Sequence, residues 1–263
     1  MTMTQREVLP GIHHIQDGMG VCMTLLIGEK RALLVDTGYG MENVAEYVAS
    51  LTDKPLTVLL THGHHDHALG AKWFPKTRMF PEDAADFQFF SGEATRRRLL
   101  NAAKERGLPV DEAAFMNDAI PMPEPMAEET IDLGGMTAQV MRCPGHTPGS
   151  AVICVPERAL LLSGDDWNPC TWLFFPAALP VWDYLRNVRR LQKLPYTHVL
   201  CSHQPVLFER AVMDAFLDGL TEDALRNARP VRMAGWETID THQADLPQGQ
   251  LLVFDYRKAF PNG

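Results

Sequence analysis

The stretch THGHHDHALG at residues 61–70 places four histidines and one aspartate within ten positions. His62, His64, Asp66 and His67 follow the spacing H-x-H-x-D-H. A tight loop at that spacing can turn alternate side chains toward two neighbouring points, and a single metal ion does not readily accept all four ligands. Zinc binds imidazole nitrogen and carboxylate oxygen at about 2.0–2.2 Å. The cluster therefore predicts a metal site, which needs further ligands from other parts of the chain if it holds two ions.

Three more candidate ligands each follow an apolar run and precede a turn. They are His146 in CPGHTPGS, Asp165 in LLSGDD and His203 in LCSHQ. The histidine cluster itself follows LTVLL, residues 56–60, a short apolar run that predicts a buried strand. If the ends of these strands converge on one edge of a sheet sandwich, all the candidate ligands come together there.

Apolar runs of strand length alternate with helical periodicity in both halves of the chain. Strands are predicted at residues 23–28, 31–38, 56–60, 137–145, 150–156, 158–166, 197–203 and 250–257, and helices at residues 40–51, 181–194 and 211–220. This alternation is typical of the α/β class, with layered sheets and helices outside. Residues 81 to about 128 differ, because two helical stretches there are followed by AIPMPEPMAEE, which is too rich in proline for regular structure. We interpret this segment as an excursion from the main sheet, and a lid over the site is one role for it.

The amino-acid composition indicates how many domains the chain forms and which class of partner it binds. A chain of 263 residues that is 46% hydrophobic can bury a sizeable core, and no linker or low-complexity tract divides it. We therefore predict one domain over residues 1–263 with a helical and proline-rich insertion at about 81–128. The net charge of -9 argues against a nucleic-acid partner, because such binding depends on clustered Lys and Arg. A small-molecule substrate is the expected ligand.

Cysteine usage and hydropathy indicate the compartment. The five cysteines are odd in number and form no C-x-x-C pair, which fits reduced thiols better than a disulfide framework. The first residues, MTMTQREVLPGIHHIQDG, lack the basic stretch and apolar run that export requires, and no stretch approaches the length of a membrane span. We expect a soluble cytoplasmic protein with no membrane partner.

The order H-x-H-x-D-H, then separated His, Asp and His, resembles the ligand pattern of the metallo-β-lactamase-like hydrolase superfamily. The segment LLVDTGYG, residues 33–40, resembles its early strand and turn, and the match covers about residues 12–205. The resemblance implies an α/β fold, a four-layer αββα sandwich of two mixed β-sheets with outer helices. It also implies two bound divalent cations, with zinc as the expectation and iron or manganese as alternatives.

Carried over residue by residue, the resemblance divides the ligands into two groups. It implies that one metal is held by His62, His64 and His146, that the second is held by Asp66, His67 and His203, and that Asp165 bridges the two. Asp166 competes with Asp165, but the pattern puts the ligand directly after Gly164. His65 has no role in the pattern. Asp36 is implied to be a buried carboxylate that hydrogen-bonds the metal loop, with a plain turn residue as the alternative.

The chemistry implied by this set is hydrolysis. Two divalent ions about 3.5–4 Å apart lower the pKa of a shared water, so that a bridging hydroxide forms near neutral pH. Asp66 would orient that hydroxide and carry its proton to the leaving group. The ligand set is closest to lactonase and glyoxalase II type members, which predicts cleavage of a carboxylic ester, lactone or thioester. An iron-dependent oxidoreductase of the persulfide dioxygenase type, a phosphodiesterase or β-lactam hydrolase, and a metal-stabilised binding module are the alternatives.

Candidate substrate contacts follow the bridging aspartate. The apolar stretch WNPCTWLFFPAALPVW, residues 167–182, contains three of the five tryptophans of the chain. It would suit the wall of a pocket for an apolar substrate group, or equally ordinary packing or the face of a homodimer. On the pocket interpretation the candidate contacts are Trp167, Trp172 and Phe174. Tyr184 could lend its hydroxyl to an oxyanion, with a core position as the alternative.

A triple arginine at residues 96–98 lies on the second predicted helix of the insertion. One interpretation is that it meets a substrate carboxylate over the site, and the other is a solvated helix face. The sequence alone assigns it no role.

Overall fold

Two mixed β-sheets form the centre of the molecule in the computed structural model, which describes residues 2–261. The first sheet has the order β1-β2-β3-β4-β5-β6-β7 and the second the order β14-β13-β11-β10-β9-β8. The strands of the first are β1 (Thr4–Leu9), β2 (Ile12–Gln16), β3 (Cys22–Ile27), β4 (Ala32–Val35), β5 (Leu56–Leu59), β6 (Arg78–Met79) and β7 (Glu124–Pro125). Those of the second are β8 (Glu129–Asp132), β9 (Thr137–Arg142), β10 (Ala151–Val155), β11 (Leu160–Gly164), β13 (His198–Cys201) and β14 (Phe208–Glu209). Both sheets combine antiparallel pairs with parallel ones, such as β4 with β5 and β11 with β13.

The strands read as continuous apolar runs because both faces of each sheet are covered. In β3, Leu26 packs into the core between the two sheets, whereas Leu25 faces a separate cluster on the outer side. In β10, Ile153 belongs to the core between the sheets and Val152 to the cluster on the opposite side. Successive strand residues point to opposite faces, so a strand covered on both sides needs an apolar residue at every position.

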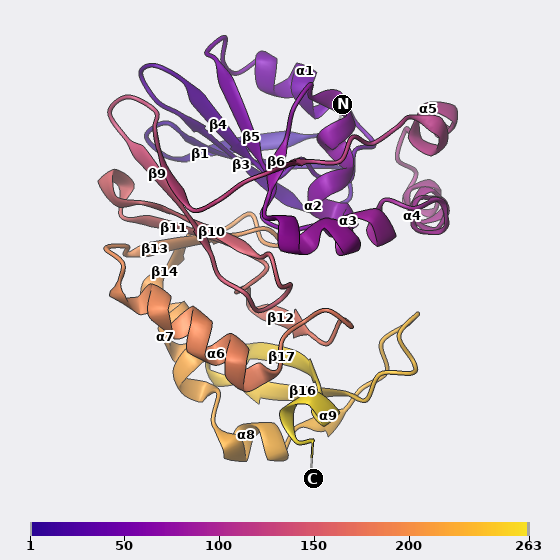
Figure 1. The fold of residues 1–263 in the computed structure, drawn as a ribbon, viewed down its shortest axis with the longest axis vertical. Coiled ribbons are helices and arrows are strands. Elements are labelled where there is room, and N and C mark those ends of the chain that lie inside the picture. Colours follow the sequence, from indigo (N-terminus) through magenta and orange to yellow (C-terminus); the bar gives the residue numbers. More distant parts are fainter. Residues whose placement is uncertain (1, 262–263) are drawn as a thin grey trace.

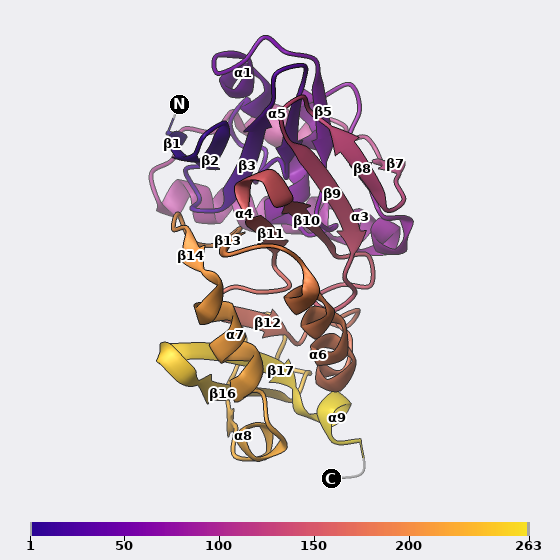
Figure 2. The ribbon, with the colours of Figure 1, turned by 90° about the vertical axis from the view of Figure 1, so that its left-hand side faces the viewer.

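Helices complete the four layers that the sequence predicts. The outer face of the first sheet is covered by α1 (Val44–Ala49), through Val44 and Val48. The outer face of the second sheet is covered by α6 (Val181–Arg189) and α7 (Arg210–Gly219). Figure 1 shows these helices on opposite sides of the paired sheets, and Figure 2 shows the same layers turned by 90°. The αββα sandwich of two mixed sheets is therefore confirmed.

A third sheet lies beyond this sandwich and was not predicted. It has the order β12-β17-β16-β15 and is made of β12 (Cys170–Leu173), β17 (Gln250–Asp255), β16 (Thr241–Leu246) and β15 (Arg229–Pro230). It packs into the same hydrophobic cluster as α6 and α7, together with α8 (Glu222–Arg226) and α9 (Tyr256–Ala259) (Figure 1). The strand predicted at residues 250–257 forms, but it pairs with β12 and β16 and does not extend a central sheet.

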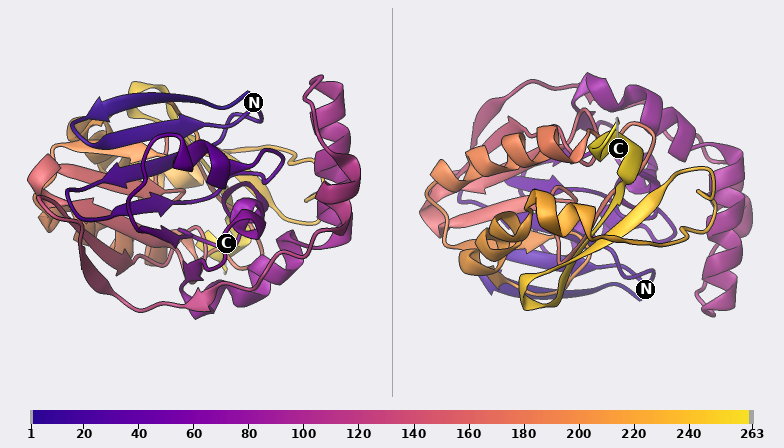
Figure 3. Two further views of the ribbon diagram at one scale, coloured as in Figure 1. Left: turned by 90° about the horizontal axis from the view of Figure 1, so that it is seen from above. Right: turned by 90° about the horizontal axis from the view of Figure 1, so that it is seen from below.

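The excursion at residues 81–128 is largely helical, as predicted. It contains α3 (Ala84–Phe90), α4 (Glu93–Glu105) and α5 (Glu112–Asn117), and its proline-rich end contributes only the two-residue strand β7. Seen from above and below, α4 stands at one side of the molecule, next to the loop between β15 and β16 (Figure 3). Within residues 2–261, none of the helices is both long and apolar enough to cross a bilayer.

Candidate metal centre

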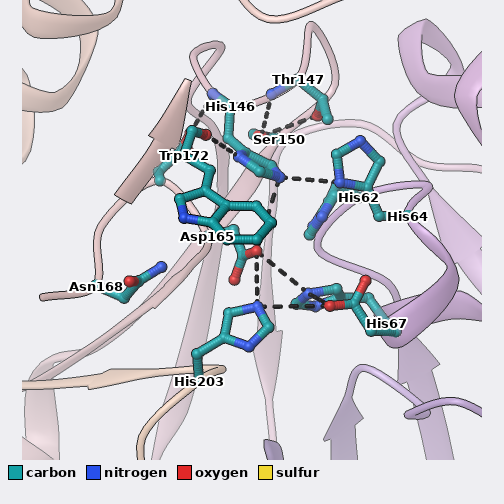
Figure 4. A network of polar contacts seen from close by, with 12 residues as sticks. His62, His64, His67, His146, Thr147, Ser150, Asp165, Asn168, Trp172 and His203 are labelled. Carbon is teal, nitrogen blue, oxygen red and sulfur yellow. Dashed lines mark hydrogen bonds and ion pairs between the residues drawn. The ribbon is translucent and has the colours of Figure 1, made fainter. Parts of the chain in front are cut away.

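The ends of four strands carry the seven candidate ligands to one edge of the sandwich. His62 and His64 follow β5, and the short helix α2 (His65–Ala68) carries Asp66 and His67. His146 follows β9, Asp165 follows β11 and His203 follows β13. Figure 4 shows the labelled ligands from these separate segments pointing toward a common centre. The sequence prediction that these seven side chains come together therefore agrees with their placement in the fold.

The ligand atoms fall into two groups. One consists of His62, His64 and His146, and the other of Asp66, His67, Asp165 and His203. Within each group, one ligand atom from every residue lies within 4.8 Å of the others. This is the division that the family resemblance implies, with a three-histidine group beside a group that contains both carboxylates.

Asp165 lies between the two groups. Its Oδ2 is 3.0 Å from His203 Nε2, 3.5 Å from His67 Nε2 and 3.7 Å from His146 Nε2. Its Oδ1 is buried and has no hydrogen-bond partner. Asp166, the competing candidate, instead accepts a hydrogen bond of 3.0 Å from the backbone N–H of His146. Asp165 therefore contacts histidines of both groups, whereas Asp166 is hydrogen-bonded to the loop that carries His146.

The second nitrogen of each of two cluster histidines is held in place, which directs the first nitrogen into the centre. His62 Nδ1 lies 3.0 Å from Thr61 Oγ1, and His67 Nδ1 lies 2.9 Å from Asp36 Oδ2. Nε2 of both imidazoles is buried without a hydrogen-bond partner. Fixing one ring nitrogen so that the other is free is the usual arrangement around a metal-binding histidine. The buried carboxylate predicted at Asp36 is present, and it also accepts hydrogen bonds from the N–H and hydroxyl of Thr61.

Of the other two histidines of the first group, only His146 has its second nitrogen held in a similar way. His146 Nδ1 lies 2.6 Å from the backbone carbonyl of Trp172, and its Nε2 faces His64 Nδ1 at 3.0 Å. His64 Nε2 lies 3.9 Å from Asp86 Oδ2 on α3, and both atoms are buried without a hydrogen-bond partner. The Nε2 atoms of His62 and His67 remain unsatisfied among these buried rings, and buried ring nitrogens without a partner are costly unless a cation binds them. The residues present therefore fit a metal ion.

Electrostatics differ between the two groups. Burial lowers the pKa of His62, His64 and His146, so these imidazoles are neutral and keep a lone pair for a metal. Burial acts in the same direction on His203, but the charge of Asp165 outweighs it and raises the pKa of His203 to about 9. Burial raises the pKa of Asp66, yet His67 and its neighbours bring it down to about 2. The two carboxylates of the second group therefore favour positive charge beside them, which protons on the histidines supply and which a divalent cation would supply in their place.

Asp83, which the sequence analysis missed, joins the two loops of the three-histidine group. The carboxylate is fully buried just before α3 and accepts hydrogen bonds from Gly63 N–H at 3.1 Å, Thr147 hydroxyl at 2.7 Å and Gly149 N–H at 2.5 Å. Gly63 separates the first two ligands of the cluster, and Thr147 follows His146. Nothing in the local sequence FPEDA distinguishes this aspartate from an ordinary residue at a helix start.

A cavity of about 630 Å³ opens onto the centre. Metal-site residues from both groups line it, and its apolar wall includes Phe90, Trp172, Phe175 and Trp236. The ring centroids of His64 and Phe90 are 4.3 Å apart, and those of His64 and Phe175 are 4.7 Å apart. Volumes of roughly 300–1,000 Å³ with a mostly apolar wall are typical of sites for small molecules. His65, to which the sequence assigned no role, also lines this cavity and stacks on Phe90.

Three of the four predicted substrate contacts lie elsewhere. Trp167, Phe174 and Tyr184 are completely buried in the hydrophobic cluster between the second and third sheets, and none lines the cavity. The hydroxyl of Tyr184 donates to the backbone carbonyl of Asp166 at 2.6 Å, so it does not face a substrate. Trp172 does line the cavity and is 41% exposed. The pocket interpretation therefore applies to part of the stretch, and the packing interpretation to the rest.

A family model of the metallo-beta-lactamase superfamily matches residues 17–203. The chain belongs to this superfamily. Solved structures with the same fold include a metallo-beta-lactamase family protein from Thermus thermophilus, with a TM-score of 0.56, 23% identity, and coverage of 83% of this chain and 84% of that one. The sec-alkylsulfatase Pisa1 from a Pseudomonas species has a TM-score of 0.63 at 15% identity, covering 84% of this chain and 42% of that one.

Curated relatives include hydrolases. The acyl-coenzyme A thioesterase MBLAC2 of Gallus gallus is 26% identical over 65% of this chain and 66% of its own length. The hydroxyacylglutathione hydrolase GloC of Haemophilus influenzae is 28% identical over 55% of this chain and 65% of its own length. This chain thus spans about two thirds of either relative. Family membership and these relatives support the prediction of a metal-dependent hydrolase.

Proposed function

We propose that this metal-dependent hydrolase uses two zinc ions to cleave a small acyl compound with an apolar part. The preferred substrate is a thioester, and a carboxylic ester or a lactone is the alternative. The observation that carries the proposal is the pair of complete ligand groups at the floor of a cavity with aromatic walls. A metal-stabilised binding module would need no such opening, because a structural metal site is closed by its ligands.

The two groups would hold divalent ions, which when bound would lower the pKa of a water and polarise the acyl carbonyl. The protein side chains set the geometry. Asp165 contacts histidines of both groups and so fixes their separation. Asp66 Oδ2, 3.5 Å from His203 Nε2 and 3.6 Å from His67 Nε2, stands at the edge of the second group beside the cavity. In this proposal, Asp66 orients the attacking water and accepts its proton.

Thioester hydrolysis at this site balances in bonds and protons. The water oxygen bonds to the acyl carbon, the carbon–sulfur bond breaks, and its electron pair leaves with sulfur. Asp66 passes the proton to the sulfur, which releases a thiol and a carboxylic acid. The acyl chain would pack against Phe90, Phe175 and Trp236, which form the aromatic wall beside the three-histidine group.

The choice of a thioester is supported by the relatives. Both MBLAC2 and GloC are named for the hydrolysis of compounds that join an acyl group to a thiol. Zinc is proposed because the donor set is imidazole and carboxylate, which zinc accepts readily. Iron or manganese would bind the same atoms. An iron-bound form would favour the alternative function as an oxidoreductase.

The experiment combines metal analysis with a substrate panel. Protein produced without added zinc is analysed for metals, stripped with a chelator, and reloaded separately with zinc, iron or manganese. Each form is assayed on a thioester, a lactone, an aryl ester, a phosphodiester and a β-lactam. We expect about two equivalents of zinc and chelator-sensitive hydrolysis of acyl substrates. One equivalent of iron together with oxygen uptake, or turnover of the phosphodiester or β-lactam alone, would refute the proposal.

A further inference from the structure

Two arginines from distant parts of the chain line the same cavity. Arg98 lies on α4, within the insertion, and Arg232 lies in the loop between β15 and β16. Figures 1 and 3 show this loop extending from the third sheet toward α4. The two segments meet, since a Cβ added at Gly235 of the loop would lie 3.6 Å from Arg98 Nη1. The guanidinium groups therefore stand on the segments that border the cavity opening.

The three arginines at residues 96–98 lie in three different environments. Arg96 donates hydrogen bonds to the backbone carbonyls of Phe115 and Asp118 and is thus part of the packing between α4 and α5. Arg97 pairs with Glu93 one turn earlier on the exposed side of the helix. Arg98 alone of the three lines the cavity above the metal centre. Because successive helical residues are about 100° apart around the axis, the three side chains cannot share one face.

Neither cavity arginine forms a close ion pair with a carboxylate of residues 2–261. Among the residues that the structure describes, no carboxylate lies within ion-pair distance of Arg98 or Arg232. Glu237, on the same loop as Arg232, accepts a hydrogen bond from the backbone N–H of Gly235, and the charge of Arg232 adds a smaller lowering of its pKa without a direct contact. The carboxylates of the cavity floor, Asp66 and Asp165, belong to the metal-ligand groups. In a chain with a net charge of -9, two unpaired guanidinium groups at one opening are a local positive site.

The cavity is therefore divided by polarity. Phe90 and Phe175, beside His64 of the three-histidine group, are buried and form its inner part, whereas Arg98 and Arg232 are exposed and form its outer part. An apolar acyl chain is stabilised in the inner part because it leaves water there. The leaving group of the same substrate then extends toward the arginines. Guanidinium groups offer several N–H donors in a fork that matches the oxygens of a carboxylate or phosphate.

We propose, as an extension of the hydrolase function above, that Arg98 and Arg232 bind an anionic leaving group, so that the substrate class is an acyl thioester of a negatively charged thiol. Carboxylate and phosphate share the required chemistry. Both arginines are specificity-determining residues and lie outside the metal-ligand set.

The test uses three hexanoyl thioesters that differ only in the leaving thiol. N-acetylcysteamine gives a neutral leaving group, 3-mercaptopropionate a carboxylate, and 2-mercaptoethyl phosphate a phosphate. Zinc-loaded wild type, R98Q, R232Q and the double variant are compared, with R97Q as the matched control on the same helix. We expect each single variant to lose about tenfold in kcat/KM on the charged substrates and less than about twofold on the neutral one. R97Q should equal wild type throughout, and R98K should recover part of the loss.

A binding measurement separates recognition from turnover. Calorimetric titration with the S-hexyl thioethers of the same three thiols, which cannot be hydrolysed, should give about tenfold weaker binding of the charged thioethers in R98Q and R232Q. Preference for the carboxylate or the phosphate thioether identifies the source of the charge. Equal losses on charged and neutral compounds, or no loss at all, would overturn the anionic-substrate proposal. If wild type hydrolyses none of the three thioesters but binds the charged thioethers through the arginines, the thioester reaction is wrong and the anion site is retained.

Discussion

The metal centre and the cover of its cavity are built in different ways. The centre consists of strand-end loops whose ligands are almost all buried, and the second ring nitrogens of His62, His67 and His146 are held by hydrogen-bond partners. The cover consists of α3, α4 and the loop between β15 and β16, and it presents exposed arginines and the 62%-exposed Phe89. The reactive geometry is thus set by the sandwich, and selectivity is set by segments added to it.

This difference has a physical reason. Catalysis and metal binding require ligand atoms within about 0.5 Å of the productive position, which only locked side chains provide. A substrate group is recognised by the apolar area that it buries and by its charge. Both kinds of recognition tolerate larger shifts of the side chains in the cavity wall. Changes at the centre should therefore act on metal binding and chemistry, whereas changes in the cover should act on the choice of substrate.

The largest effect is expected from Asp66→Ala. The variant removes both a ligand of the second group and the carboxylate proposed to accept the proton, so kcat should fall by roughly 10²–10⁴-fold. The side chain lies at the cavity edge, so the fold should remain intact. Turnover, metal content and thermal unfolding are measured together. Asp53→Ala, an exposed aspartate on a surface turn, is the control, and full activity in Asp66→Ala would remove this residue from the mechanism.

A second effect concerns how the His203 loop is held to the first sheet. His14 on β2 is buried, with Nε2 3.1 Å from the carbonyl of Gln204 and Nδ1 3.0 Å from Thr24 Oγ1. Burial lowers the pKa of His14 from 6.5 to about 4. As pH falls from 6.5 to 4, the unfolded chain binds a proton that the folded chain does not, so the free energy of unfolding decreases with falling pH.

Between pH 6.5 and pH 4, His14 alone should lower the free energy of unfolding by about 3 kcal/mol, at about 1.4 kcal/mol per pH unit. Chemical unfolding of chelator-treated protein between pH 4 and 7.5 should therefore show a shallower pH dependence in His14→Gln than in wild type. Parallel curves for the two proteins would contradict the assignment. The result tests whether His14, which is not a candidate ligand, holds the His203 loop to the first sheet.

Asp83→Asn tests the connection between the two loops of the three-histidine group. Burial raises the pKa of Asp83 to about 6, so at pH 8 it is an ionised acceptor for three donors. The amide of asparagine turns an N–H₂ toward one of these donors, which costs about 1–3 kcal/mol of stability. Zinc affinity should fall by roughly 10–100-fold, as for other groups that orient ligands. Glu82→Gln, an exposed neighbour, is the control, and unchanged zinc affinity in Asp83→Asn would show that the loops are held without it.

Most residues of the metal centre could be predicted from the sequence, whereas few residues of the cavity wall could be. Ligands at strand ends could be placed, because the strands are strongly apolar and their ends share one edge. The cavity wall depends on the pleat of β12, a strand that the sequence analysis did not recognise. Its burial alternates, so Trp172 faces the cavity while Leu173 is buried. Without that register, Trp167 and Phe174 looked equivalent to Trp172, and Phe175 was not selected.

Contacts between segments that are far apart in the chain could not be predicted from the sequence either. Arg98 and Arg232 line the same cavity only because the unpredicted third sheet extends a loop toward α4. The insertion holds none of the proposed ligands. In the fold, however, Leu99 and Phe115 of the insertion cover Leu69, two residues after the last ligand of the cluster. Deleting residues 92–127 would expose that core, so point substitutions in the cover are the cleaner test.

The smallest expected effect, and the sharpest test of the cover, is Trp236→Ala. Trp236 stands on the loop that carries Arg232, with its ring centroid 5.3 Å from that of Phe175 and 6.4 Å from that of Phe90. Its removal takes apolar surface from the inner wall, so KM for a hexanoyl thioester should rise about tenfold, with zinc content unchanged. An acetyl thioester, too short to use this wall, is the internal control, and Trp236→Phe should restore most of the affinity. Loss of zinc, or an equal rise in KM for both chain lengths, would mean that the cover also supports the metal centre and that the two regions are not separable.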